Sequence, residues 1–159
     1  MDVSVLFVCL GNICRSPTAH GVFAQLVADH QLNHRIDTDS CGTAAWHSGK
    51  PPDSRSVAAA AKRGYDLTPL RARQVSRSDF DQFDYILAMD QANLTDLQAL
   101  CPSNYSGELG LFLSYGDSEL LAVPDPYYGD DNGFEAVLDL VEQASQGLLA
   151  HIQQHAKLR

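Results

Sequence analysis

A cysteine and an arginine stand at the two ends of a short loop near the start of the chain. Cys9 follows the apolar run of residues 3–8, whose β-branched content predicts a buried parallel strand. Five residues separate Cys9 from Arg15. Ser16 can then cap a helix, and Pro17 suits the first helical position. The sequence therefore predicts a strand that turns into a helix, with Cys9 and Arg15 on either side of the turn.

The residue types of this loop favour the binding of an anion. Successive backbone N–H groups in such a turn form a concave nest, and the following helix adds the positive end of its dipole. Gly11 permits backbone geometry that a side chain would forbid, and Arg15 can bind an oxyanion through two parallel hydrogen bonds. The same field favours a thiolate at Cys9, which would be an activated nucleophile toward a bound phosphate ester. A core cysteine and a solvated arginine are the ordinary alternatives, but the combination with a neighbouring hydroxyl favours the chemical interpretation.

A second candidate lies in the last quarter of the chain. Asp125 stands between Pro124 and Pro126, whose fixed backbone angles limit where the carboxyl can point. An aspartate between prolines can simply form a turn. A positioned carboxyl can also act as a general acid and base.

Together, these two stretches resemble one known family. The run Cys9-Leu10-Gly11-Asn12-Ile13-Cys14-Arg15-Ser16-Pro17 resembles the active-site loop of the low-molecular-weight protein tyrosine phosphatases, and Asp125-Pro126-Tyr127-Tyr128-Gly129 resembles their general-acid loop. The resemblance covers the whole chain and implies one phosphatase domain over residues 1–159. It implies hydrolysis of protein phosphotyrosine and small aryl phosphates through a phosphocysteine, with no cofactor and no metal.

The resemblance also assigns expected roles to individual residues. Cys9 would attack phosphorus, Arg15 and the loop amides would bind the phosphate, and Asp125 would serve as acid and then base. Ser16 would hydrogen-bond the thiolate, while Asn12 and Ser40 would support the loop. The expected substrate-binding residues are Leu10, Gly11, Asn12, Ile13, Cys14, Ser16, Trp46, Tyr127 and Tyr128.

Two positions refine this expectation. Related enzymes that act on phosphoarginine resemble this loop but carry threonine where this chain has Ile13, so isoleucine favours aryl phosphates. The family often places a histidine that supports the loop asparagine where this chain has Leu70, which leaves the support of Asn12 open.

Cys14 is the expected redox partner of Cys9. A reversible disulfide between them would protect Cys9 from further oxidation, whereas the plain alternative is that Cys14 only fills space.

Composition narrows the class of protein. The 159 residues carry a formal net charge of −9, which speaks against nucleic-acid or acidic-membrane binding. We expect a cytoplasmic protein with reduced thiols, because no export signal and no membrane-spanning stretch is recognisable. The four cysteines fit no standard zinc pattern. The expected partner is a phosphotyrosine-containing protein, and the chain is expected to be a monomer or weak homodimer.

The predicted fold is α/β: a single domain with a doubly wound, four-stranded parallel sheet of flavodoxin-like topology and helices on both faces. Strand patterns alternate with helical patterns along the chain. Asp53 and Asp90 are predicted N-caps, and Gly64 a helix stop. The predicted strands are 3–8, 36–41, 85–89 and 108–113. The predicted helices are 17–30, 53–63, 90–100 and a long one from Gly133, with a short helical turn at 78–83.

Two other functions remain open from the sequence. An arsenate reductase on the same fold would need a relay of cysteines, for which Cys41 and Cys101 are present but not closely paired. A non-catalytic phosphate-binding module would not need Cys9, Arg15 and Asp125 together. The physiological substrate is not encoded in these motifs.

Overall fold

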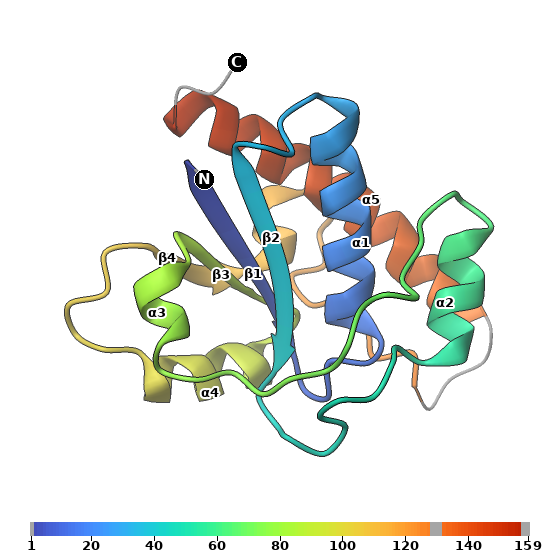
Figure 1. Cartoon of the computed structure of the whole chain (residues 1–159), viewed down its shortest axis with the longest axis horizontal. Coiled ribbons are helices and arrows are strands. Elements are labelled where there is room, and N and C mark those ends of the chain that lie inside the picture. Colours follow the sequence, from blue (N-terminus) through green and yellow to red (C-terminus); the bar gives the residue numbers. More distant parts are fainter. Residues whose placement is uncertain (1, 128–131, 157–159) are drawn as a thin grey trace.

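A four-stranded, all-parallel sheet forms the centre of the computed structural model, which describes residues 2–127 and 132–156 (Figure 1). The strand order is β2-β1-β3-β4, so β1 is a central strand that pairs on both sides. This confirms the predicted doubly wound sheet. The strands are β1 (Val3–Cys9), β2 (Ile36–Gly42), β3 (Tyr85–Ala88) and β4 (Glu108–Leu111).

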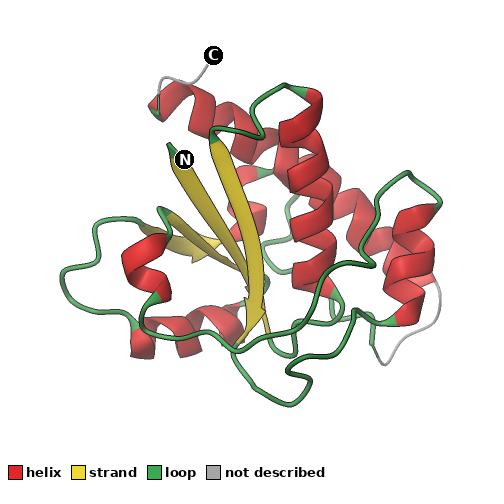
Figure 2. Cartoon of the chain, viewed as in Figure 1, coloured by secondary structure: helices red, strands yellow, loops and turns green. Residues whose placement is uncertain are grey.

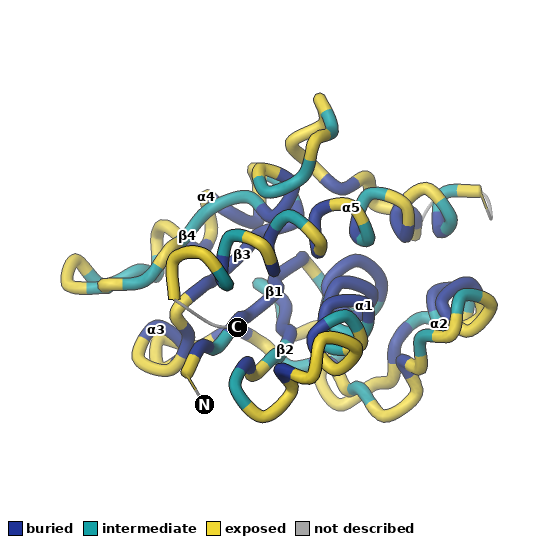
Figure 3. The backbone as a smooth tube through the Cα atoms, turned by 90° about the horizontal axis from the view of Figure 1, so that it is seen from above, coloured by how far each residue is buried: buried dark blue, intermediate teal, exposed yellow. Residues whose placement is uncertain are grey.

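Helices cover both faces of the sheet (Figure 2). The alternation of side chains along β1 explains this, because successive residues point to opposite faces. Val5 and Phe7 belong to the core cluster that includes residues of α1, α2 and α5, whereas Leu6 and Val8 belong to the cluster that includes residues of α3 and α4. Figure 3 shows β1 as a buried strand between these two layers. The helices are α1 (Arg15–Asp29), α2 (Ser54–Ala61), α3 (Asp79–Gln82), α4 (Gln91–Leu100) and α5 (Asn132–His155).

Two predicted helix starts are confirmed in atomic detail. The Asp53 carboxylate accepts a hydrogen bond from the Arg55 amide at the start of α2, and the Asp90 carboxylate accepts one from the Asn93 amide at the start of α4. Each contact satisfies an N–H group that has no partner within its helix. Gly64, the predicted stop, has a φ of +89°, which glycine adopts without steric cost.

The predicted cap of the first helix is wrong. Helix α1 begins at Arg15, with Cys14 as the N-cap residue and no side-chain capping bond. Ser16 lies inside the first turn, because its hydroxyl contacts the Cys9 sulfur instead of a helix amide. Pro17 is tolerated there because the first-turn N–H groups lack intrahelical partners anyway.

The fourth strand is also shorter than predicted. Strand β4 ends at Leu111, and Phe112–Tyr115 form a short 3₁₀ helix, η1. The Ser114 hydroxyl donates to the Leu111 carbonyl, which offers the backbone an alternative to sheet pairing. The turn buries the Phe112 ring against Phe7 in an edge-to-face contact. Within the described residues, no helix is long and apolar enough to cross a membrane.

Candidate active site

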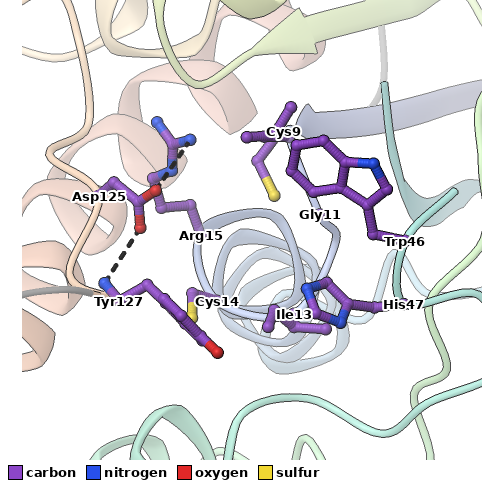
Figure 4. A pocket seen from close by; sticks show the side chains of 10 residues that line it. Cys9, Gly11, Ile13, Cys14, Arg15, Trp46, His47, Asp125 and Tyr127 are labelled. Carbon is purple, nitrogen blue, oxygen red and sulfur yellow. Dashed lines mark hydrogen bonds and ion pairs between the residues drawn. The ribbon is translucent and has the colours of Figure 1, made fainter. Parts of the chain in front are cut away.

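The loop after β1 surrounds the Cys9 sulfur. Cys9 is only 3 % exposed, and its Sγ accepts a hydrogen bond from the Asn12 amide at 3.2 Å. The Ser16 Oγ lies 3.0 Å from the same sulfur. In Figure 4 the sulfur points into a pocket that also exposes Arg15 and Asp125. The pocket is lined by Cys9, Leu10, Gly11, Ile13, Cys14, Arg15, Trp46, His47, Asp125 and Tyr127.

The peptide groups of the loop turn their carbonyls outward. The Cys9 and Leu10 carbonyls accept from the amides of Thr43 and Ala44, and the Ile13 carbonyl accepts from the Asp53 amide. In a planar trans peptide, the N–H of the next residue points the opposite way. The amides that follow these three carbonyls are therefore directed to the inner side of the loop. With the N-terminus of α1 behind it, the loop has the features of an anion nest.

Arg15 is fixed by carboxylates and a carbonyl beside the pocket. Its Nη1 donates to Asp90 Oδ2 at 2.6 Å and to the Val123 carbonyl at 3.1 Å, and its side chain is 5 % exposed. Its Nη2 lies 3.9 Å from Asp125 Oδ2. A buried guanidinium needs such partners, and this arrangement holds it beside the Cys9–Ser16 loop. Arg15 and Asp125, which lie far apart in the sequence, are thus brought together.

Asp125 stands at the mouth of the pocket, opposite Cys9 (Figure 4). Its Oδ1 accepts from the Tyr127 amide at 3.1 Å, which orients the carboxylate. Arg55 binds the same loop, because its Nη2 donates to the Tyr127 carbonyl at 3.0 Å and its guanidinium stands 5.4 Å from the centre of the Tyr127 ring. Tyr128, the other predicted tyrosine, lies outside the described residues.

Asn12 links the loop to the rest of the fold. Its φ of +57° is a left-handed conformation that asparagine tolerates better than most residues. Its Nδ2 donates to Ser16 Oγ at 2.8 Å, and its Oδ1 accepts from the Arg73 amide at 3.0 Å. Ser40, the other predicted support, makes its side-chain contact with His20 of α1, at 3.0 Å from Nδ1.

Apolar and aromatic side chains form the rim. Trp46 is 71 % exposed, and Tyr127 and Leu10 are each 37 % exposed, although all three line the pocket. The gathering of three exposed apolar side chains around one pocket is typical of a surface that receives a ligand. Ile13 lies on the pocket wall, where it presents carbon atoms.

Comparisons with known proteins agree with this geometry. The sequence pattern of the family described as "Low molecular weight phosphotyrosine protein phosphatase" matches residues 4–158. The chain belongs to this family. It is 42% identical over 157 residues to the low molecular weight protein-tyrosine-phosphatase YfkJ of Bacillus subtilis, covering 98% of this chain and 99% of that protein.

Solved structures of similar chains share the fold. A crystal structure of a protein tyrosine phosphatase from Entamoeba histolytica with Hepes in its active site has a TM-score of 0.91 and 38% identity, over 96% of this chain and 97% of that one. A Drosophila arginine phosphatase has a TM-score of 0.88 and 32% identity, over 94% and 97% of the two chains. The family fold therefore carries more than one named activity.

The other cysteines of this family member differ from Cys9 in their surroundings. Burial raises the pKa of Cys14 to about 12, although the Ser56 hydroxyl partly offsets this shift. Burial likewise raises the pKa of Cys41. Both side chains are therefore thiols near neutral pH. Cys14 lines the same pocket as Cys9.

Sequence reasoning missed three neighbours of the pocket in this phosphatase-family chain. Asp90 was expected only as a cap, yet it also forms the ion pair with Arg15. Its position directly beyond β3, the strand next to β1, is the signal that could have indicated this contact. His47 was overlooked beside Trp46, and no local pattern indicates that Arg55 reaches the loop of Asp125.

Proposed function

We propose that this protein hydrolyses phosphotyrosine in a protein substrate through a phosphocysteine on Cys9. The observation that carries the proposal is the convergence of Cys9, Arg15 and Asp125 on one pocket. These residues supply a nucleophile, a phosphate-binding cation and a proton donor, which are the groups that phosphate monoester hydrolysis requires.

In the first step, the Cys9 thiolate attacks phosphorus in line with the leaving oxygen. Arg15 and the inward loop amides bind the three non-bridging oxygens and stabilise their spread charge in the transition state. Asp125, in its protonated form, donates a proton to the leaving phenol oxygen as the P–O bond breaks. A proton donor of this kind contributes about 10²–10⁴-fold to the rate.

In the second step, Asp125 is a carboxylate and takes a proton from water. The water oxygen bonds to phosphorus, the S–P bond breaks, and inorganic phosphate leaves. Ser16 stabilises the departing thiolate, because its hydroxyl lies 3.0 Å from the sulfur. Asn12 assists in two ways. Its side-chain amide donates a hydrogen bond to the Ser16 hydroxyl, and its backbone amide donates one to the Cys9 sulfur.

The shape of the pocket favours a long aryl phosphate. The nucleophile is 3 % exposed, whereas Trp46 at the rim is 71 % exposed, so the phosphate must reach below an aromatic edge. We expect a phosphotyrosine ring to lie between Trp46 and Tyr127, which both line the pocket, and the shorter phosphoserine to be a poorer substrate. Tyr128 stays a proposed rim residue on the family resemblance alone.

Substitution of the nucleophile tests the mechanism. We expect Cys9→Ser to abolish turnover of p-nitrophenyl phosphate, while phosphate still binds because Arg15 and the amides are retained. Cys101→Ser, on the sheet face that carries α3 and α4, is the matched control and should keep normal activity. Near-normal turnover by Cys9→Ser would refute the mechanism.

Phosphoarginine is the competing substrate, because a Drosophila arginine phosphatase shares this fold. Ile13 on the pocket wall favours the aryl ring, since it offers no hydroxyl to a guanidinium nitrogen. We expect kcat/KM for a phosphotyrosine peptide to exceed that for the matched phosphoarginine peptide. The reverse order would replace the proposed substrate class while leaving the mechanism at Cys9 intact.

A further inference from the structure

The segment of residues 72–75 connects the loop that carries Trp46 with the loop that carries Cys9. It belongs to the long connection from α2 to α3, which passes the carboxyl end of β2 in Figure 1. The Gly42 amide donates to the Arg73 carbonyl at 2.8 Å, and the Val75 amide donates to the Gly42 carbonyl at 2.8 Å. On its other side, the Ala72 amide donates to the Lys50 carbonyl at 2.9 Å. The segment therefore braces both ends of the 42–50 loop, which carries Trp46.

The same segment reaches the nucleophile through three hydrogen bonds in series. The Arg73 amide donates to Asn12 Oδ1 at 3.0 Å, Asn12 Nδ2 donates to Ser16 Oγ at 2.8 Å, and Ser16 Oγ lies 3.0 Å from Cys9 Sγ. Because both ends of the Asn12 amide are occupied, its orientation is determined by the Arg73 backbone on one side and by Ser16 on the other.

The Arg73 side chain is held from two directions. Its Nε and Nη2 donate to Asp39 Oδ2 of β2 at 3.3 and 3.0 Å. Its Nη2 and Nη1 donate to the two oxygens of Asp79, at the start of α3, at 3.0 and 3.1 Å. Asp79 is 3 % exposed and also accepts from the Ser76 amide. A buried carboxylate of this kind requires a paired cation, so the guanidinium anchors the backbone of residue 73 to β2 and α3.

We propose that Arg73 is a positioning residue of the active site, which acts on Cys9 through Asn12. The proposal rests on the proposed function. Position 70 cannot take this part, because the leucine side chain has no hydrogen-bonding group and packs against the hydrophobic core. The carboxylate clamp on Arg73 instead sets the amide that holds the Asn12 side chain, and the Asn12 side chain in turn holds the hydroxyl beside the nucleophile.

A double-mutant cycle tests the route through Asn12. We expect Arg73→Met to lower kcat for p-nitrophenyl phosphate by roughly tenfold to a hundredfold, the range for small displacements of reacting groups, with a smaller change in KM. Asn12→Ala should give a similar loss. Adding Arg73→Met to Asn12→Ala should then change kcat by less than about threefold, because the two substitutions interrupt the same connection.

Arg63→Met is the matched control. Arg63 is also an arginine bound by carboxylates, those of Glu135, Asp139 and Glu142 on α5, and within the described chain none of these partners lines the pocket. We expect Arg63→Met to change kcat little, both in the wild type and in the Asn12→Ala variant. If the fold-loss of kcat in the Arg73→Met and Asn12→Ala double variant equals the product of the two single fold-losses, the proposal is wrong.

Alkylation of Cys9 provides a readout that needs no turnover. We expect iodoacetamide to modify Cys9 more slowly in Arg73→Met than in Arg63→Met, because the Ser16 hydroxyl beside the sulfur is no longer held in place. Peptide mass spectrometry follows the reaction. If Arg73→Met does not fold, Asp39→Ala removes one of the two carboxylates at a partly exposed position and should show the same slowing. Equal alkylation rates would refute the positioning role. An inactive wild-type enzyme would instead refute the proposed function, and the alkylation comparison would still decide the role of Arg73.

Discussion

Asp90 combines two tasks in one side chain. Its Oδ1 caps α4 by accepting from the Asn93 amide, and its Oδ2 binds Arg15 at 2.6 Å. The two oxygens therefore connect the stability of a helix to the orientation of Arg15, the proposed phosphate-binding cation. Because the Arg15 side chain is nearly buried, its ion pair is less screened by solvent than a surface pair.

Two substitutions separate these tasks. We expect Asp90→Asn to retain the cap but to lose the ion pair with Arg15, so that kcat/KM falls about tenfold and the protein loses the stability that this pair contributes. Asp90→Ala should lower activity similarly and be about 1 kcal/mol less stable than Asp90→Asn, because it also lacks the cap. Steady-state kinetics and urea unfolding of both variants provide the measurement. Equal stabilities of the two variants would contradict the capping argument.

We propose that Cys14 reacts only after Cys9 has been oxidised, since both cysteines line the same pocket. With a pKa of about 12, its thiol does not compete as a nucleophile at neutral pH. In this proposal, peroxide oxidises Cys9 to a sulfenic acid, and the Cys14 sulfur then displaces water to form a disulfide. We expect mild peroxide treatment to give a Cys9–Cys14 disulfide that dithiothreitol reverses, with activity restored.

The matched variant for this prediction is Cys14→Ser. Without the second sulfur, the sulfenic acid of Cys9 should proceed to the sulfinic and sulfonic acids, and dithiothreitol should no longer restore activity. Peptide mass spectrometry distinguishes these products. Sulfonate on Cys9 of the wild type, without an internal disulfide, would dismiss the protective role of Cys14.

At the scale of elements, α5 packs very closely on η1. A Cβ added at Gly147 would overlap the backbone carbonyl of Tyr115, which no side-chain rotation can relieve. We expect Gly147→Ala to destabilise the protein by about 1–3 kcal/mol, despite the better helix propensity of alanine, because overpacking outweighs it. Gly133→Ala, in the first turn of the same helix, meets only ordinary contacts and should be neutral or slightly stabilising. Urea unfolding of both variants tests the difference, and equal stabilities would contradict it.

The elements that sequence could predict are those with strong local signals. The apolar run of β1, the capping aspartates and the periodic pattern of α5 all depend on neighbours in the chain, and the structure confirms them. The start of α1 was mispredicted because Ser16 has a tertiary contact that overrides its capping preference. The same limit applies to the site, since the ion pair of Arg15 with Asp90 joins residues from different elements. Such a contact can be predicted only when the strand order is used to place Asp90, at the end of β3, beside the end of β1.

At the scale of the whole molecule, the acidic net charge is compatible with the proposed phosphate site because the groups that would bind phosphate act locally. The formal net charge is −9, yet the pocket wall contributes Arg15, the inward amides and the N-terminus of α1. Electrostatic forces over longer distances are screened within about 8–10 Å at physiological ionic strength. The short-range groups therefore dominate the interaction with a phosphate held inside the loop.

The stability of the whole chain should depend on pH through His20. Burial lowers the pKa of His20, and Arg73 also lowers it, whereas Asp39 and Asp37 on β2 partly oppose the shift. The folded state therefore favours neutral His20, while the unfolded chain protonates near its ordinary pKa of about 6.5. As pH falls below that value, the unfolded state binds a proton that the folded state does not, so stability decreases, by at most about 1.4 kcal/mol per pH unit for one group.

A comparison of histidine variants isolates this contribution. We expect His20→Gln to flatten the fall in unfolding free energy between about pH 7 and pH 5, because the titrating group is gone and the amide can still contact Ser40. His34→Gln removes an exposed histidine and should leave the slope close to that of the wild type. Urea unfolding at several pH values measures the slopes. If His20→Gln kept the full wild-type slope, protonation of other groups would account for the acid sensitivity, and His20 would have no share in it.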